Sequence, residues 1–377
     1  MRIGIEAQRI QRKKKHGMDI VAVEIIRQLQ AIDTMNDYFI FVKADEDKEV
    51  IQNTANFQVI ELPGKSYADW EQISLPRAAK KYRLDVLHCT SNTAPLVGNT
   101  PLIVTVHDII YLEKLHFKQG TWYQKLGNVY RRWNVPRIMK KAERILTVSH
   151  FEKDNIQRAF PKQAVHVYTV YNAASSHFQA IHNANTLEEA RKKFGLPNEF
   201  IFFLGNTDPK KNVPNVLKAY SVYRKGHSQP LELVMPDLQA SYLESILSEI
   251  GDANLRAHIH LTGYVPNKQL PLIYNLAKFF LYPSKRESFG IPILEAMQCG
   301  KAVITSSTSS MPEIAEDAAL LVDPASIEAI AHAIQQLTDD VQLRESLEAK
   351  GLKRAQDFNW TQSAQEVLNH YKAIAHA

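Results

Sequence analysis

The segment Pro283-Ser-Lys-Arg-Glu-Ser-Phe-Gly-Ile-Pro-Ile-Leu-Glu-Ala-Met297 is the most informative part of this chain. The residues just before it, 278–282, are apolar and β-prone, which predicts a buried parallel strand. Gly290 permits a tight turn, and Pro292 suits a first helical position. The segment therefore predicts a strand, a turn and a helix in that order, with Glu287 before the turn and Glu295 about one turn into the helix.

This predicted turn combines groups that bind phosphate with groups that bind hydroxyls. The helix begins with free backbone N–H groups and the positive end of its dipole, which attract phosphate. Glu287 is expected at the carboxyl end of the strand, where open α/β sheets bind their ligands, and Glu295 lies close enough to accept from hydroxyls. A diphosphate joined to hydroxylated rings, as in a nucleotide-sugar, fits such a pocket.

At these residues the sequence resembles the retaining glycosyltransferases of family 4, which have the GT-B fold. Their signature is Glu, seven residues and Glu, with Phe-Gly after the first Glu and Glu-Ala-Met at the second, and 287–297 matches it without gaps. The resemblance continues through 300–305, 311–314 and 317–324. The competing interpretation is a surface helix with one capping and one solvated glutamate, and the length of the matching string argues against it.

Strands alternate with helical patterns in both halves of the chain, which predicts an α/β protein with doubly wound parallel sheets. Strands are expected at 2–5, 38–42, 86–88, 102–106 and 144–148, and then at 200–204, 231–234, 258–261, 278–282 and 302–305. The 377 residues fit two domains. The resemblance implies two Rossmann-like domains facing a cleft. We expect an acceptor-side domain at 1–175, completed by a crossover helix at 358–377, and a donor-side domain at 176–357.

The loop 204–212 follows a predicted strand and precedes a helix, so it is expected near the same site. Gly205 permits close backbone approach, and Lys211 can place an ammonium group on a diphosphate. The resembling family usually has an Arg soon after this glycine and a Lys five residues beyond it. Here Asn206 stands at the Arg position while Lys211 matches the Lys, so the diphosphate is expected to depend on one cation. A solvated Lys-Lys pair on a turn is the alternative.

The first domain offers His107 and Asp108 at the end of a predicted strand. In the resembling family a His in this stretch lies against the transferred sugar, although a strand-end His is often only structural. Gly17 belongs to the loop 8–19, which is expected to approach the cleft. The resemblance thus implies a catalytic set of Glu287, His107 and Lys211, a donor-binding set of Glu295, Phe289, Gly290, Ile291, Asn206 and Gly205, and Gly17 and Asp108 on the acceptor side.

Two basic clusters allow an interpretation beyond solvated charge. Arg12-Lys-Lys-Lys15 lies in the first loop, and basic and aromatic residues that include Trp122, Arg131, Arg132 and Trp133 are interspersed over 122–144. One interpretation is contact with an anionic acceptor or with an anionic membrane surface. The other is a solvated charged loop and a packed helix with a charged outer face.

Composition excludes several other classes of protein. Two cysteines, Cys89 and Cys299, imply no disulfide framework, and the N-terminus has no signal-peptide layout, so a cytoplasmic location is expected, peripheral on the inner face of the membrane if the basic clusters bind lipid. Asp45-Glu-Asp47 resembles a metal-binding Asp-x-Asp, but its flanking lysines predict a solvated turn, and no metal or other cofactor is expected. The net charge of +5 comes without any nucleic-acid motif.

The sequence predicts a retaining glycosyltransferase that moves a hexose-type sugar from a nucleoside-diphosphate sugar to an acceptor hydroxyl. The acceptor is expected to be a saccharide or a lipid-linked saccharide, in polysaccharide or glycolipid biosynthesis. Three alternatives stay open: a nucleotide-sugar isomerase or phosphorylase on the same fold, a non-catalytic partner subunit, and a membrane-surface scaffold. The intact pair of Glu287 and Glu295 argues against the partner subunit, while Asn206 argues for it.

Overall fold

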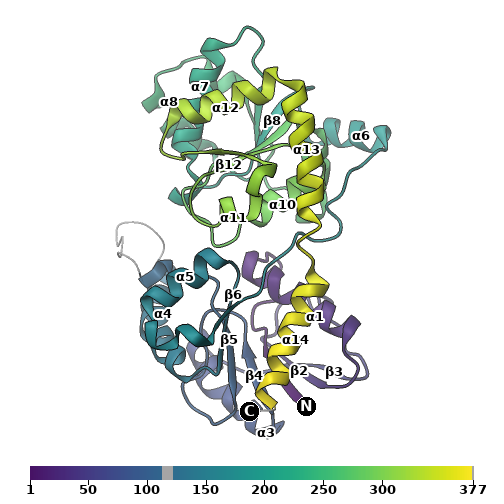
Figure 1. The fold of residues 1–377 in the computed structure, drawn as a ribbon, viewed down its shortest axis with the longest axis vertical. Coiled ribbons are helices and arrows are strands. Elements are labelled where there is room, and N and C mark those ends of the chain that lie inside the picture. Colours follow the sequence, from purple (N-terminus) through teal and green to yellow (C-terminus); the bar gives the residue numbers. More distant parts are fainter. Residues whose placement is uncertain (113–121, 376–377) are drawn as a thin grey trace. The chain divides into compact units, whose positions relative to one another are not determined.

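The computed structural model describes residues 1–112 and 122–375, which form two compact units (Figure 1). Unit 1 comprises residues 1–172 and 359–377, and unit 2 comprises residues 173–358. Each unit has its own sheet and its own hydrophobic core.

Unit 1 is built on a seven-stranded sheet in the order β3-β2-β1-β4-β5-β6-β7. Its neighbouring strands are parallel throughout, and the side chains of the inner strands are buried on both faces of the sheet. The strands are β1 (Arg2–Glu6), β2 (Asp37–Val42), β3 (Phe57–Glu61), β4 (Val86–Cys89), β5 (Leu102–Thr105), β6 (Arg144–Thr147) and β7 (Val167–Thr169).

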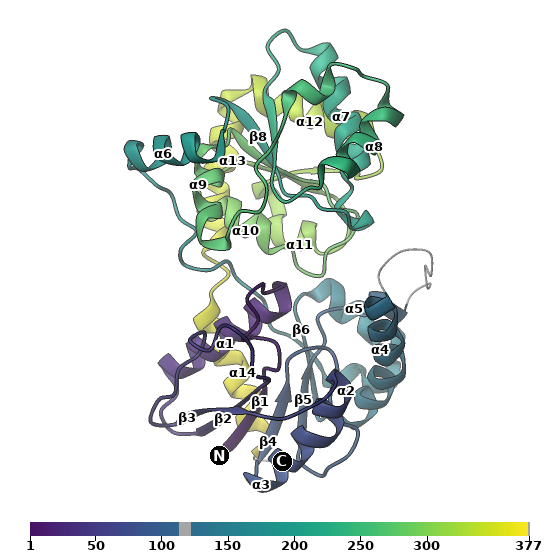
Figure 2. The same ribbon diagram turned by 180° about the vertical axis from the view of Figure 1, so that it is seen from behind.

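Helices cover both faces of this sheet. One core cluster joins the strands to a helical run of α2 (Tyr67–Asp69), a π-helical turn at 70–74 and α3 (Leu75–Lys81), and to α4 (Trp122–Lys141). On the other side α1 (Gly17–Ile32) lies beside α14 (Trp360–Ala375), as both views show (Figure 2). The unit also contains α5 (His150–Ala159).

The chain therefore returns to unit 1 for its last helix. Tyr371 of α14 is fully buried, and its hydroxyl lies 2.7 Å from Nδ1 of His88 on β4. Nε2 of His88 lies 2.7 Å from the Thr105 hydroxyl on β5. Burial and the nearby His370 and His107 lower the pKa of His88 to about 3, so this link between helix and sheet is uncharged at neutral pH.

Unit 2 repeats the plan with a six-stranded parallel sheet in the order β10-β9-β8-β11-β12-β13. The strands are β8 (Phe200–Phe203), β9 (Glu232–Met235), β10 (Ile259–Leu261), β11 (Phe279–Tyr282), β12 (Val303–Ser306) and β13 (Leu320–Val322). The helices are α6 (Ala184–Phe194), α7 (Val213–Gly226), α8 (Ala240–Ile250), α9 (Leu270–Leu276), α10 (Ile291–Gln298), α11 (Met311–Ala315), α12 (Ile327–Asp339) and α13 (Val341–Ala355).

The predicted doubly wound parallel sheets are confirmed, and each sheet has a point where its strand order reverses. In unit 1 this point lies between β1 and β4, and in unit 2 between β8 and β11. The prediction missed β3, β7 and β13, all of them at the ends of the sheets or next to them. Gly17, which was predicted to lie within a loop, is instead the first residue of α1, so the first loop ends at His16.

Candidate functional site

The loops after β8 and β11 bring Lys211 and Glu287 together at the strand-order reversal of unit 2. Nζ of Lys211 lies 2.7 Å from Oε1 of Glu287, and both side chains are nearly buried, at 15% and 11% exposure. The hydroxyl of buried Tyr282, at the end of β11, lies 2.5 Å from Nζ of Lys211 and donates to Oε1 of Glu287 at 3.0 Å. The three side chains form one compact group at the carboxyl edge of the sheet, where α/β proteins bind ligands.

The charge of Glu287 depends on this pairing. Burial by itself raises the pKa of the carboxyl, but Lys211 and Lys210 outweigh that effect, so the pKa of Glu287 lies below its ordinary value. Glu287 is consequently a carboxylate at neutral pH. Burial raises the pKa of Tyr282 well above its ordinary range, which keeps its phenol protonated as a donor.

Hydrogen bonds from two other loops hold the Glu287 turn in place. Ser309 Oγ accepts from the Glu287 N–H at 3.1 Å, and Ser310 Oγ donates to the carbonyls of Glu287 and Phe289 at 2.9 Å each. Fully buried Asn212, in the left-handed conformation with φ 62°, donates to the carbonyls of Pro283 at 3.0 Å and Pro324 at 2.7 Å. Sequence reasoning missed all three residues. The run of five Ser and Thr residues at 306–310, directly after a strand, was the available signal.

The turn at Gly290 has the predicted geometry. Gly290 has φ +99° and precedes α10, and Pro292 is the second helical residue. Because the Ile293 N–H bonds back to the Gly290 carbonyl at 2.9 Å and Pro292 has no N–H, Gly290 and Ile291 carry the first-turn donors without a partner in their own helix. The ring of Phe289 is buried and packs edge-on against Phe358, with centroids 5.7 Å apart.

Glu295 lies one turn into α10 and is more deeply enclosed than its predicted role requires. It is 7% exposed, and its Oε2 accepts from the hydroxyl of fully buried Tyr274 at 3.0 Å. Burial raises the pKa of Glu295 to about 7, although Tyr274 and Lys211 oppose the shift. The two glutamates of the motif therefore differ in charge near neutral pH.

The structure assigns a packing role to Gly205. A Cβ at this position would lie 2.7 Å from the ring of buried Phe203 and 3.0 Å from Val213, so no side chain fits. Asn206 is exposed, and its Oδ1 accepts from the Asp208 N–H at 2.9 Å, which makes a local turn. Lys211 is the loop cation that contacts Glu287, and Lys210 adds a weaker electrostatic effect.

In unit 1, His107 follows β5 and is 6% exposed. Its Nε2 donates to the Thr90 carbonyl at 2.9 Å, and its backbone N–H donates to Oδ1 of Asn92 at 2.7 Å. Burial lowers the pKa of His107, so the ring is neutral at pH 7, with Nδ1 as an acceptor. Asp108 is half-buried, and its Oδ1 accepts from the Ile110 N–H at 3.2 Å.

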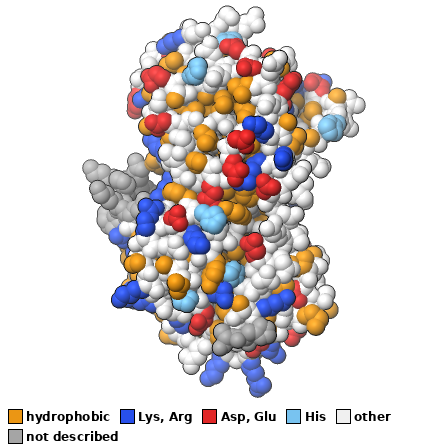
Figure 3. Space-filling model, in the orientation of Figure 1, with side chains coloured by type: hydrophobic (Ala, Val, Ile, Leu, Met, Phe, Trp, Pro, Cys, Tyr) orange, Lys and Arg blue, Asp and Glu red, His pale blue; other side chains and the backbone are white. Residues whose placement is uncertain are grey.

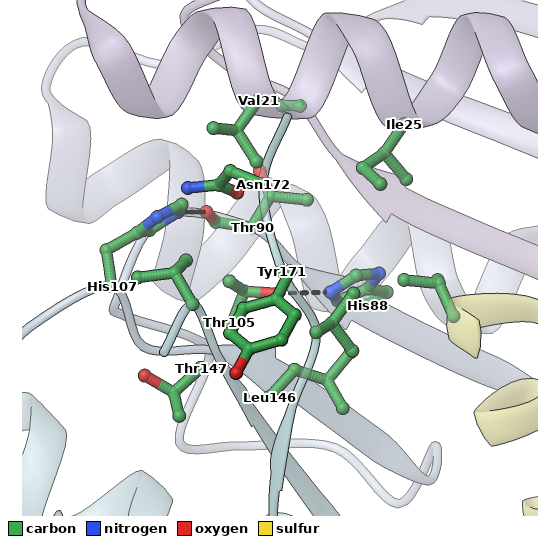
Figure 4. A pocket seen from close by; sticks show the side chains of 14 residues that line it. Val21, Ile25, His88, Thr90, Thr105, His107, Leu146, Thr147, Tyr171 and Asn172 are labelled. Carbon is green, nitrogen blue, oxygen red and sulfur yellow. Dashed lines mark hydrogen bonds between the residues drawn. The ribbon is translucent and has the colours of Figure 1, made fainter. Parts of the chain in front are cut away.

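A cavity of about 30 Å³ lies beside His107 and His88 (Figure 4). Thr105, Thr147 and Asn172 are among its lining residues. Ligand pockets usually enclose roughly 300–1,000 Å³, so this cavity is too small for a sugar. It is lined by residues of unit 1, among them the candidate site residue His107.

Gly17 is exposed, and a Cβ added there would meet nothing within 4 Å, so neither packing nor conformation requires a glycine. Two of the four residues in the neighbouring basic run form ion pairs. Nζ of Lys15 lies 2.5 Å from Asp47, and Nζ of Lys13 lies 3.2 Å from Glu46. The two charged runs that appeared separately in the sequence therefore pair with each other.

The second basic cluster lies on α4, where the side chain of Trp122 falls outside the described residues. Arg132 donates to the Tyr111 carbonyl at 2.7 Å, and Arg131 donates to Asn128 at 3.1 Å. Trp133 is 46% exposed, with the Arg137 guanidinium 5.0 Å from its ring centre. The helix is packed on one side and presents mixed basic and apolar residues on the other.

Glu71 is a buried carboxylate of unit 1 that sequence reasoning missed. It lies in the π-helical turn at 1% exposure and accepts from the hydroxyls of Thr93, Tyr130 and Tyr67. Burial raises its pKa to about 7. An isolated Glu in a polar stretch gave no signal, because its partners are distant in sequence.

Residues 1–112 and 122–375 contain no group of three His, Cys, Asp or Glu side chains that could hold a metal ion. Within that same part of the chain, no helix is both long and apolar enough to cross a membrane.

Two family models match the chain, one in each unit. Residues 186–354 match the model described as Glycosyl transferases group 1, and residues 16–176 match Glycosyltransferase Family 4. The O-antigen chain mannosyltransferase B of Escherichia coli is 32% identical over 274 residues, which cover 72% of this chain and 70% of that protein. The serotype-specific mannosyltransferase WbdA of Escherichia coli is 30% identical over 241 residues, which cover 62% of this chain and 29% of that longer protein.

Among solved structures, the crystal structure of Anabaena Alr3699/HepE in complex with UDP and glucose superposes on this chain with a TM-score of 0.75. The two sequences are 17% identical, and the superposition covers 99% of this chain and 100% of that one. The likeness shows that the two proteins share a fold.

We predict that Glu295→Gln stabilises unit 2 at high pH. The folded pKa of about 7 exceeds the ordinary value of 4.5, so stability is lost as pH rises from about 4.5 through 7. The variant should match the parent near pH 4 and exceed it by about 3 kcal/mol near pH 8. Hydrogen exchange of unit 2 peptides measures this free energy. Exposed Glu345→Gln is the control, and a gain that is equal at both pH values would contradict the assignment.

Proposed function

Since the chain belongs to the family 4 glycosyltransferases, the glycosyl transferases group 1 with the GT-B fold, we propose that it moves a hexose-type sugar from a nucleoside-diphosphate sugar to an acceptor hydroxyl. The resemblance noted in the sequence is confirmed, and the protein is a glycosyltransferase. The observation that carries the finer proposal is the group of Lys211, Glu287 and Tyr282 beside the start of α10.

In this proposal unit 2 binds the donor. The diphosphate lies at the start of α10, where the N–H groups of Gly290 and Ile291 and the helix dipole stabilise the charge of the departing group. Lys211 adds a point charge from the neighbouring loop. The leaving group thus has fixed dipoles and one cation, which is the set that a metal-independent reaction needs.

Glu287 and Lys211 act as a coupled pair. The ammonium group that neutralises Glu287 is the same one that is assigned to the diphosphate, so it lies between two anions when the donor binds. Glu287 accepts from sugar hydroxyls, and its negative charge favours the positive charge that develops on the sugar ring. Tyr282 donates to Glu287 and keeps the carboxylate oriented.

Glu295 is assigned to the ribose hydroxyls. Tyr274, which donates to Glu295 in the structure, stays a neutral donor. Burial and the Glu295 charge raise the pKa of its phenol well above the ordinary range. A ribose hydroxyl that donates to Glu295 would favour the charged carboxylate and lower its pKa from about 7. Donor binding is then linked to proton release from this residue.

Unit 1 is assigned to the acceptor, with His107 as its sugar-facing residue. The neutral ring with its proton on Nε2 leaves Nδ1 able to accept from a hydroxyl. Asn92, in the left-handed conformation with φ 68°, holds the His107 backbone in place. Retention of the anomeric configuration is proposed from family membership.

Mannose is the first sugar to test, since the relatives with at least 30% identity are named mannosyltransferases. The names of two relatives refer to O-antigen chains, which supports polysaccharide synthesis with a saccharide or lipid-linked saccharide acceptor. We propose that the transfer reaction takes place in the cytoplasm. The base of the nucleotide stays open, because the UDP complex belongs to a protein that is only 17% identical.

The test is a transfer assay with uridine and guanosine diphosphates of mannose, glucose and galactose, offered with and without oligosaccharide acceptors. Nucleoside diphosphate release that depends on acceptor, with a retained anomeric centre in the product by NMR, is the expected result. Conversion of the donor sugar without acceptor would identify an isomerase, and phosphate-dependent cleavage a phosphorylase. Activity should persist in EDTA, and loss that Mg²⁺ or Mn²⁺ restores would overturn the metal-independent proposal.

We expect Glu287→Gln to lower kcat/KM by about 10²–10³, because it removes a preorganised charge that acts in the transition state. The amide oxygen can still accept from Lys211, so binding of the free nucleoside diphosphate should persist. Steady-state kinetics and calorimetry measure the two quantities. Exposed Glu328→Gln serves as the control, and an unchanged kcat/KM in the Glu287 variant would remove this residue from the mechanism.

Lys211→Ala should weaken nucleoside diphosphate binding roughly 10- to 100-fold, since a hydrogen bond to a charged group contributes about 1.5–3 kcal/mol. Binding of the bare nucleoside should change little, because it carries no phosphate. Lys225→Ala is the control from unit 2, an exposed lysine whose ammonium group lies 3.6 Å from Asp252. An equal loss for both ligands would show that Lys211 acts on folding and not on phosphate.

A further inference from the structure

Unit 1 contains a second concave region, a groove of about 590 Å³, remote from His107. It lies at the amino-terminal edge of the sheet, where α3 meets the segment that leads into β5, and Leu87 and Leu102 at the starts of β4 and β5 are among its lining residues. His107 follows the carboxyl end of β5. In a parallel sheet these are opposite edges, so the groove is separate from the acceptor residues proposed above. Its volume is that of a site for a small organic ligand.

All charged side chains that line the groove are basic. Arg77, Lys80, Arg83 and Lys141 line it, and its lining includes no Asp or Glu. Among the described residues, none of these four side chains forms a salt bridge. Blue side chains gather at the lower end of unit 1, where α3 lies (Figures 1 and 3). Cations that line a concave surface without counter-charges focus a positive potential there, and an anion relieves their mutual repulsion.

The fold positions Lys141 through a hydrogen bond and constrains the backbone of Arg83. Lys141, at the end of α4, donates to the Pro95 carbonyl at 3.3 Å, and burial lowers its pKa. Arg83 lies just beyond α3 in the left-handed conformation, with φ +49°, a position that helices usually give to glycine. An arginine there strains the backbone, and Arg83 is among the residues that line the groove.

The groove also has an apolar component. Val97 is 59% exposed on its rim, and Leu84 and Pro76 contribute to its wall. A ligand that fills this groove therefore contacts both basic and apolar side chains. Guanidinium groups bind phosphate through two parallel hydrogen bonds, which ammonium groups supplement as point charges.

We propose that this groove is a binding site for a phosphate-bearing ligand, distinct from the donor and acceptor sites, with Arg77, Lys80, Arg83 and Lys141 as its cations. The phosphate belongs either to a soluble phosphate ester or to a lipid headgroup, and the chemistry of recognition is the same. The inference does not depend on the proposed transferase reaction, because none of its residues takes part in that reaction.

The test compares three proteins: the parent, Lys80→Ala/Arg83→Ala, and the control Lys65→Ala/Lys162→Ala. The control removes two exposed lysines of unit 1 that do not line the groove. Calorimetry with inorganic pyrophosphate measures the soluble ligand, and sedimentation with phosphatidylglycerol or phosphatidylcholine vesicles measures the lipid. Each protein also carries Lys211→Ala, which weakens pyrophosphate binding at the donor site.

The groove variant should bind weaker than the control by at least about fivefold for each cation removed, with binding that declines as salt rises. A loss confined to pyrophosphate supports a soluble ligand, and a loss confined to phosphatidylglycerol vesicles supports a headgroup. Equal binding by the groove variant and the control in both assays overturns the proposal.

Arg83→Gly separates binding from folding. Because glycine relieves the left-handed strain, this variant should melt at a higher temperature than the parent while it binds the phosphate probe more weakly. Weaker binding together with a lower melting temperature would indicate damage to unit 1 and would count against the proposal.

Discussion

The ion pair between Lys211 and Glu287 is the constraint on which the arrangement of unit 2 depends. A nearly buried carboxylate is costly without a counter-charge, so the loops after β8 and β11 must approach closely enough for the pair to form. Asn212 supports this approach, since its amide group joins the β8 loop to carbonyls at the ends of β11 and β13. Ser309 and Ser310 then hold the Glu287 backbone from the β12 side. The site is thus an ion pair with a rigid frame of short polar side chains around it.

The two glutamates of the motif show how neighbours decide the chemistry of identical side chains. Both are largely buried, but Glu287 has an ammonium group at 2.7 Å and Glu295 has a phenol at 3.0 Å. The first is therefore charged across the neutral range, while the second has a pKa of about 7. The spacing of eight residues between them reveals neither state, because each depends on a partner from another element. Glu71 in unit 1 resembles Glu295, because hydroxyl groups surround its carboxyl group and burial raises its pKa.

The sequence predicted the structural features that depend on residues close together in the chain. The turn at Gly290, the helix with Pro292 in its first turn and the buried strand before Glu287 all follow from conformational preference and from hydrophobic pattern, and the structure contains them. The sequence did not predict contacts between residues that are far apart in the chain. Lys211 and Glu287 are 76 residues apart, and Lys15 and Asp47 are 32 apart, so neither pair leaves a local signal. Strands β7 and β13 have three residues each, too short for an alternating pattern to stand out.

The return of the chain to unit 1 has a consequence for biosynthesis. Unit 2 is one continuous segment, so all of its residues are synthesised before the last helix. The hydrogen-bond partner of His88 on α14 is Tyr371, which lies 283 residues further along the chain. Until that helix is translated, α1 lacks its neighbour and Nδ1 of His88 lacks its hydrogen-bond partner. The order in which the two units become complete in sequence therefore reverses the order in which they begin: unit 1 starts first, but all residues of unit 2 are synthesised before those of unit 1 are.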